Sequence, residues 1–113
     1  MTKQEILDKV TALGRALMNE EVHDAIHLIG ELKINTPTYS PIAEYLKEIV
    51  LRTLTEKVSQ MGGKFQVTRR GEYNTPTTDY YKIEDGVLKR NGNPAKWTSL
   101  GKLYQAYKQI EGE

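Results

Sequence analysis

The sequence predicts one small α+β domain in which helices come first, a small antiparallel sheet follows, and a further helix ends the chain. Three observations lead to this prediction. Apolar residues recur every three or four positions in the first half, as they do on the buried face of a helix. After Gly62-Gly63 the apolar period shortens to two, which is typical of a strand. Asp85-Gly86 then gives a strong signal for a two-residue hairpin turn.

Length and composition agree with a single hydrophobic core. The chain has 113 residues, of which 38% are hydrophobic and 27% are charged, values that are ordinary for a globular protein. We therefore expect one domain over 1–113, mainly helical in 1–61, with a small sheet in 62–97 and a helix in 98–111.

The composition also bears on location. There is no cysteine, so a disulfide framework is excluded and a reducing compartment is permitted. The N-terminus lacks the apolar stretch of a secretory signal, and no run approaches the roughly 20 apolar residues of a membrane helix. By elimination we expect a cytoplasmic protein with no membrane contact.

Two helices are predicted before residue 34, joined as a hairpin by a short linker. Thr2 and Glu5 form a capping box at the start of the first helix, and Asn19 is the expected N-cap of the second. The first helix carries one apolar stripe, formed by Ile6, Val10, Leu13 and Leu17. This stripe is either internal core or a two-fold interface between helices, so a homo-oligomer through the N-terminal helices is an open alternative.

A third, long helix and the sheet follow. Pro37 breaks the chain after the second helix, and Ser40-Pro41 is a good start signal for the third helix, which Gly62-Gly63 ends. We expect strands at 64–70, 80–83 and 87–90, a loop over 71–78, and a last helix that begins at Thr98 or Ser99.

The two-residue turn fixes the register of the predicted hairpin. Ile83 then faces Leu88 on the core side, and Lys82 lies directly opposite Lys89 on the outer side. Like charges directly opposite each other are unfavourable in a sheet. Either Glu84 screens the two lysines and nothing binds, or the lysines belong to an anion-binding strip.

The second interpretation draws on a compositional asymmetry. Residues 62–113 contain nine Lys and Arg against six Asp and Glu, and most of the aromatic residues. Basic and aromatic side chains together are the mixture that nucleic-acid surfaces use, although sheets also favour aromatic residues. The candidate residues for binding an anion or a partner are Lys64, Arg69, Arg70, Tyr80, Lys82, Lys89, Arg90, Lys96 and Trp97.

Catalytic signatures are absent from the sequence. There is no nucleophile elbow and no phosphate-binding loop. His23 and His27 lie one helical turn apart, but they fall on a charged helix face without a third metal ligand. We therefore predict a protein that is not an enzyme and that uses no metal and no cofactor.

These observations favour a small binding protein that acts through protein–protein contacts. Its size and charge balance suit an accessory or inhibitor protein of the kind that phages and mobile elements encode. The alternative is binding of nucleic acid or of a nucleotide through the basic and aromatic region 64–97. The two functions differ in their response to salt, which weakens nucleic-acid binding steeply.

Overall fold

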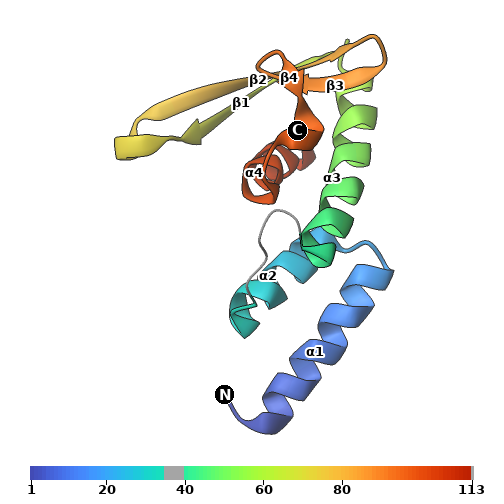
Figure 1. Ribbon diagram of the computed structural model, residues 1–113, viewed down its shortest axis with the longest axis vertical. Coiled ribbons are helices and arrows are strands. Elements are labelled where there is room, and N and C mark those ends of the chain that lie inside the picture. The colour runs from blue at the N-terminus through green and yellow to red at the C-terminus, as the bar shows by residue number, and fades with distance from the viewer. Residues whose placement is uncertain (35–39, 113) are drawn as a thin grey trace. The chain divides into compact units, whose positions relative to one another are not determined.

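The computed structural model describes residues 1–34 and 40–112 (Figure 1). In these residues it contains four α-helices and one four-stranded antiparallel sheet, which confirms the predicted α+β class. The chain groups into two compact units, Met1–Ile49 and Val50–Glu113, and each is described by itself. The break predicted at Pro37 lies outside the described residues.

The first unit contains α1 (Lys3–Met18), α2 (Val22–Leu32) and the first half of α3 (Pro41–Gln60). Helices α1 and α2 pack against each other. The predicted cap of α1 is confirmed, because the Thr2 hydroxyl accepts a hydrogen bond from the Glu5 N–H at 3.2 Å. The core of this unit is made of small and branched apolar residues: Leu13, Ala16, Val22, Ala25, Ile29, Ala43, Leu46 and Ile49.

The predicted start of the second helix was wrong by two residues. Asn19 is the C-cap of α1, because its N–H donates to the Arg15 carbonyl at 2.9 Å and so continues the first helix. The chain turns at Glu20, whose φ of 57° is left-handed, and Glu21 is the N-cap of α2 without a side-chain cap. Two acidic residues thus occupy the turn and the cap position that a single asparagine was expected to fill.

The apolar stripe of α1 is divided between core and surface. Leu13 is buried, whereas the side chains of Ile6 and Val10 are 41% and 50% exposed. The end of α1 is held by Tyr45 of α3, whose hydroxyl donates to the Leu17 carbonyl at 2.9 Å. Only part of the stripe is therefore used for packing within the described residues.

Helix α3 begins and ends as its sequence predicts. The Ser40 hydroxyl accepts a hydrogen bond from the Ala43 N–H at 3.2 Å, and Pro41 occupies the first helical position. Gly62 and Gly63 follow the helix with φ values of 87° and 85°, which residues with a Cβ rarely adopt. The two glycines stop the helix and lead directly into the sheet.

The second unit contains the sheet, in the order β1-β2-β3-β4, together with α4. Two short 3₁₀ turns, Glu72–Asn74 and Ala95–Trp97, connect these elements. The bounds are β1 Lys64–Arg70, β2 Pro76–Glu84, β3 Val87–Arg90, β4 Asn93–Pro94 and α4 Leu100–Glu111. The core of this unit includes Val50, Leu54, Val58, Val67, Tyr81, Leu88, Leu103, Ala106 and Ile110.

The loop predicted over 71–78 is shorter than expected. The N–H of Gly71 donates to the Thr75 carbonyl at 2.8 Å, which closes a compact turn. Tyr73 and Asn74 take left-handed φ values of 58° and 61° within it. Strand β2 therefore starts at Pro76, opposite Arg70, and the threonines that follow it pair with β1.

The predicted hairpin register is confirmed in full. Ile83 pairs with Leu88 and Lys82 pairs with Lys89. Asp85 and Gly86 have φ values of 55° and 76°, the two left-handed positions that this turn type requires. The turn dipeptide therefore sets which residues of β2 and β3 share a face.

The two faces of the sheet differ in burial and composition. Opposed residues share a face, and successive residues alternate between faces. Val67, Asp79 and Tyr81 are almost fully buried on one face, which we call the covered face. The open face carries exposed polar side chains and one aromatic ring, from Lys64, Gln66, Thr68, Tyr80 and Lys82.

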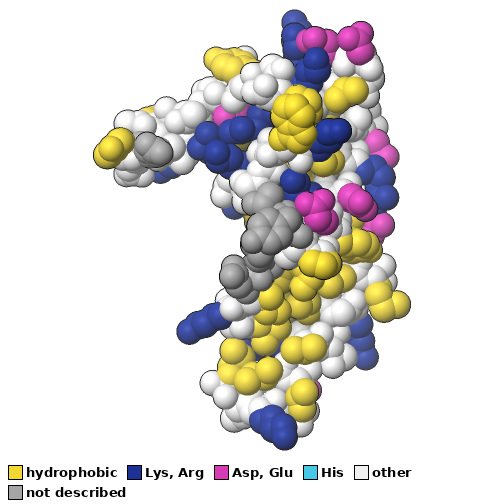
Figure 2. Space-filling model, viewed as in Figure 1, with side chains coloured by type: hydrophobic (Ala, Val, Ile, Leu, Met, Phe, Trp, Pro, Cys, Tyr) yellow, Lys and Arg dark blue, Asp and Glu magenta, His cyan; other side chains and the backbone are white. Residues whose placement is uncertain are grey.

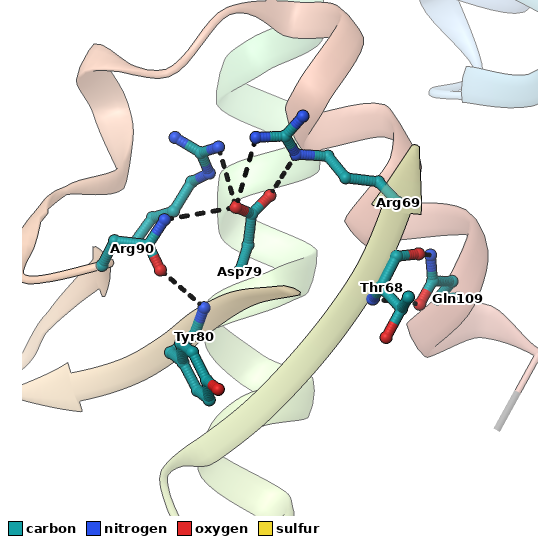
Figure 3. Close-up of polar contacts among 7 residues, drawn as sticks. Thr68, Arg69, Asp79, Tyr80, Arg90 and Gln109 are labelled. Carbon is teal, nitrogen blue, oxygen red and sulfur yellow. Dashed lines mark hydrogen bonds and ion pairs between the residues drawn. The ribbon is translucent and has the colours of Figure 1, made fainter. Parts of the chain in front are cut away.

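Strand β1 forms one edge of the sheet, and α4 protects that edge. The side chain of Gln109 donates to the Thr68 carbonyl at 2.7 Å and accepts from the Thr68 N–H at 3.2 Å (Figure 3). The amide thus takes the place that a residue of another strand would occupy. Blocking an edge in this way disfavours pairing with a second chain.

Replacing Gln109→Ala should therefore free the edge of β1. We expect a loss of about 1 kcal/mol in the free energy of unfolding, faster exchange of the Thr68 amide, and more self-association. Urea denaturation, amide hydrogen exchange and light scattering measure the three effects. Gln105→Ala, one turn earlier on α4, is the matched control, and equal behaviour of the two variants would contradict this role for Gln109.

Candidate functional site

A buried carboxylate organises the covered face of the sheet. Asp79 of β2 is 1% exposed. Its Oδ2 lies 2.7 Å from Nε of Arg69 on β1, and its Oδ1 lies 3.1 Å from Nη2 of Arg90 on β3 (Figure 3). Asn91 adds a hydrogen bond from Nδ2 to Oδ1 at 3.2 Å. One carboxylate therefore joins three neighbouring strands.

Two opposing effects act on the pKa of Asp79. Burial alone raises the pKa of this carboxyl, since it penalises the charged form. Hydrogen bonds from Arg69, Asn91 and Arg90, together with the charge of Arg90, outweigh burial and hold the pKa below its ordinary value. The carboxylate is thus charged at neutral pH, and two guanidiniums share it, which leaves the cluster with one excess positive charge.

Asn91 links this cluster to the neighbouring turn. Its side-chain oxygen accepts from the Tyr80 N–H at 2.8 Å, and its own N–H donates to the Tyr80 carbonyl at 2.8 Å. Its φ of 51° is left-handed, a conformation that asparagine tolerates better than most residues. The start of the Asn91-Gly92 turn is therefore fixed relative to β2.

Two hollows open beside this cluster, where the sheet meets the start of α4. One, of about 600 Å³, is lined by residues that include Arg90, Trp97, Ser99 and Lys102. The other, of about 500 Å³, is lined by residues that include Arg69, Arg70, Ser99 and Lys102. We call these six residues, Arg69, Arg70, Arg90, Trp97, Ser99 and Lys102, the α4-start surface.

The α4-start surface is positive. No aspartate or glutamate is among the described residues that line either hollow. Lys102 is exposed and has no ion pair with another described residue, and Arg70 is held by a hydrogen bond to the Asn74 carbonyl at 3.3 Å. Figure 2 shows Lys and Arg side chains gathered between the β1-β2 hairpin and α4.

Two further features suit this surface to a ligand. Trp97 is 70% exposed, which is unusual for the largest apolar side chain. Ser99 is the N-cap of α4 but makes no side-chain cap hydrogen bond, so the first N–H groups of the helix keep their capacity to bind an anion. The surface thus offers an aromatic ring next to several donors of positive charge.

The nine candidate residues do not form one strip. Arg69 and Arg90 lie on the covered face with Asp79, and Trp97 and Lys96 follow β4 in the second 3₁₀ turn. Lys64, Tyr80, Lys82 and Lys89 lie on the open face, whereas Arg70, at the end of β1, lines the same hollow as Arg69. The structure therefore separates the predicted strip into two surfaces.

The opposed lysines are compensated. Glu84 lies 2.7 Å from Lys82 Nζ and 3.3 Å from Lys89 Nζ. The hydrogen bond from Lys82 and that from Lys89 lower the pKa of Glu84, so the carboxylate stays charged between the two ammonium groups. This is the screening that one of the two interpretations anticipated, and the lysine pair alone no longer argues for a ligand.

Sequence reasoning missed Ser99 and Lys102 as parts of the surface. One signal could have found Lys102. It lies in the first turn of α4, where the helix dipole favours acidic residues and opposes a lysine. A cation placed there against local preference points to a role outside the helix.

The histidine pair lies on α2. Nε2 of His27 lies 2.6 Å from the carboxylate of Glu31, which Lys9 also contacts. No group of three histidines, aspartates or glutamates in the described part of the chain could hold a metal ion. None of the helices in that part is long and apolar enough to cross a membrane.

Comparison with protein family models, curated proteins and solved structures finds no match.

Replacing Asp79→Asn should lower the free energy of unfolding at neutral pH by about 3 kcal/mol, because two half-buried guanidiniums lose their counter-charge. The pKa of Asp79 is depressed in the folded state, so its contribution is complete above the unfolded carboxyl pKa of about 3.9 and is lost as pH falls through the lower folded pKa. The difference between wild type and variant should therefore shrink below about pH 4. Urea denaturation between pH 3 and 7 measures it.

Asp85→Asn is the matched control, since Asn-Gly is an equally good turn and Asp85 is exposed. The control should behave as wild type at both ends of the pH range. A stability difference for Asp79→Asn that does not change with pH would contradict the charge-based role.

Proposed function

We propose that the protein binds single-stranded nucleic acid on the α4-start surface. The observation that carries this proposal is the pair of adjoining hollows that share Ser99 and Lys102, contain no carboxylate among their described lining residues, and lie beside the exposed ring of Trp97. Phosphate groups are bound by lysine and arginine, and unpaired bases stack on aromatic rings.

Ion pairs with Asp79 hold Arg69 and Arg90 in position before any ligand binds. Asp79 holds Arg69 through two contacts, at 2.7 and 3.5 Å, and Arg90 through one at 3.1 Å. A guanidinium that is already positioned loses less side-chain entropy when a phosphate arrives. The cluster has one excess positive charge, and Arg69 lines the same hollow as Arg70 and Lys102, so this charge adds to their attraction for an anion.

The shape of the surface favours a single strand over a duplex. Sequence readers of duplex DNA insert a helix or a β-ribbon into the major groove. Here the exposed elements are the end of a helix and one tryptophan on a short turn, and a base can stack on that ring only when it is unpaired. The exposed ring of Trp97 is thus the feature that favours binding of a single strand over a duplex.

The change Lys102→Glu should weaken oligonucleotide binding by roughly ten-fold or more and reduce the slope of log K against log salt by about 0.7, the loss of one phosphate contact. The sequence has one tryptophan, so quenching of its fluorescence reports stacking on Trp97 directly. Titration of a labelled oligodeoxythymidine at several salt concentrations gives the affinity and the slope.

Lys3→Glu makes the same charge change at a residue that lines neither hollow and should leave both quantities as in wild type. Binding that does not respond to salt, or equal effects of the two variants, would overturn the proposal.

A second candidate function, binding through protein contacts, is favoured by a different observation on α1. Its exposed apolar side chains include Leu7, at 51%, and Met18, at 82%, in addition to Ile6 and Val10. Figure 2 shows hydrophobic side chains gathered over α1 and α2. Contiguous exposed apolar surface of this kind is typical of an interaction site.

The occupant that fits this face best is a second copy of α1 in antiparallel orientation. Leu7, Val10, Gly14 and Leu17 follow a 3-4-3 spacing and lie on one helix face. With Val10 placed opposite Gly14, a large residue faces a position where an added Cβ would meet nothing within 4 Å. The same register places Leu7 of one helix opposite Leu17 of the other, twice over.

A charge placed in this seam should separate the two copies. Val10→Glu is expected to shift sedimentation towards the monomer, because it places two carboxylates between apolar side chains. Ala12→Glu, on the opposite side of α1, is the matched control and should associate as wild type. Analytical ultracentrifugation at increasing concentration measures the equilibrium, and a wild-type chain that stays monomeric throughout, or equal behaviour of the two variants, would exclude this interface.

A further inference from the structure

We infer that the open face of the sheet carries a nucleotide-binding subsite, in which a base stacks on Tyr80 and its phosphate is bound by Lys64 and Lys82. Where the nucleotide belongs to a bound strand, this inference rests on the proposed function. A free mononucleotide has the same chemistry, and the experiment below distinguishes the two sources.

The strand register brings these side chains together. Lys64 of β1 is paired with Lys82 of β2, and Gln66 of β1 is paired with Tyr80. Paired residues project from the same face, so the four side chains form a square on the open side of the sheet. These four residues line a hollow of about 410 Å³, together with Phe65, Tyr81, Asn91 and Gly92.

The hollow is positive and contains no aspartate or glutamate among its described lining residues. Lys64 has no ion pair with another described residue, and its side chain is exposed. Lys82 contacts Glu84, but that one carboxylate is shared with Lys89. The row of three lysines across β1, β2 and β3 therefore keeps two positive charges that Glu84 does not balance.

Tyr80 is a rigid platform as well as an exposed one. Its ring is 57% exposed, while its N–H and its carbonyl are both bonded to Asn91 at 2.8 Å. A ring held on a fixed backbone loses little freedom on stacking. Gln66, directly opposite, carries an amide with both donor and acceptor groups, which suits the edge of a base.

The volume of this hollow and the side chains that line it together indicate the class of ligand that it can bind. A hollow of about 410 Å³ has room for one small molecule and not for a folded partner. A planar ring, two ammonium groups and one amide match a base with a phosphate better than an aliphatic acid, which would not use the ring, or a neutral aromatic compound, which would not use the lysines.

This subsite adjoins the α4-start surface. Asn91 lines both the hollow over Tyr80 and the hollow beside Trp97. Tyr80 lies on β2 and Trp97 follows β4, so a strand bound to both rings would pass Asn91, which lines both hollows. Gly92, where an added Cβ would meet nothing within 4 Å, leaves that passage open.

The test compares Tyr80→Ala with Tyr80→Phe, which keeps the ring, and with Tyr73→Ala. Tyr73 is 95% exposed in the β1-β2 turn and serves as the control for loss of a surface tyrosine. The probes are a fluorescein-labelled oligodeoxythymidine of about 12 nucleotides, a length within the range of a single small domain, and free thymidine monophosphate, followed through the amide signals of Lys64 and Gln66. Tyr80→Ala should weaken oligonucleotide binding by roughly 5- to 150-fold, and the other two variants should bind as wild type.

Tyr80→Thr, which preserves strand propensity, replaces the alanine variant if the latter does not fold. Wild type that binds the oligonucleotide with an affinity that Tyr80→Ala and Tyr80→Thr do not change would overturn the subsite and leave the α4-start surface standing. Wild type that binds only the mononucleotide, with signals lost in Tyr80→Thr, would support the subsite and overturn the proposed function. Absence of binding to either probe would overturn both.

Discussion

The second unit depends on the placement of one charge, the carboxylate of Asp79. Removing a carboxylate from water costs several kcal/mol unless its partners replace the lost hydration. Here the partners come from both neighbouring strands, so the charge is stable only while Arg69 of β1 and Arg90 of β3 remain in register with β2. The ion cluster therefore couples the alignment of the sheet to the position of two guanidiniums at its surface.

Some buried polar atoms at the ion cluster make no hydrogen bond with a described residue, which bears on whether the cluster serves stability alone. The Tyr81 hydroxyl and Nε of Arg90 are buried without a hydrogen-bond partner among the described residues, and burial raises the pKa of Tyr81 to about 12. An unpaired buried donor costs free energy, and apolar residues of similar volume often replace a buried ion cluster with no loss of stability. Stability alone thus gives a weak account of this network. Presenting arginines in a fixed position is something that an apolar core could not do.

The local sequence predicts the order of the helices and strands and the register of β2 and β3, but it does not predict which face of the sheet is buried. Gly62-Gly63 and Asp85-Gly86 act through backbone conformations that few other residues adopt, so the end of α3 and the β2-β3 register could be predicted. In β1 and β2, however, some consecutive residues are identical, as in Arg69-Arg70 and Tyr80-Tyr81. Alternation shows that such neighbours point apart, and only packing against helices shows which one is buried. The predicted strip was divided for this reason.

The charge of the whole chain gives a further constraint on how it acts. With a net charge of +1, long-range attraction to a polyanion is weak, so binding must come from local arrangement. The structure offers such an arrangement twice in one unit, since acidic side chains are absent from the described linings of the hollows beside Trp97 and Tyr80. Few cations and two rings imply a modest salt dependence and a large contribution from stacking. A ligand with both phosphates and accessible bases uses every group that these surfaces present, whereas a polyanion without bases would leave the two rings exposed.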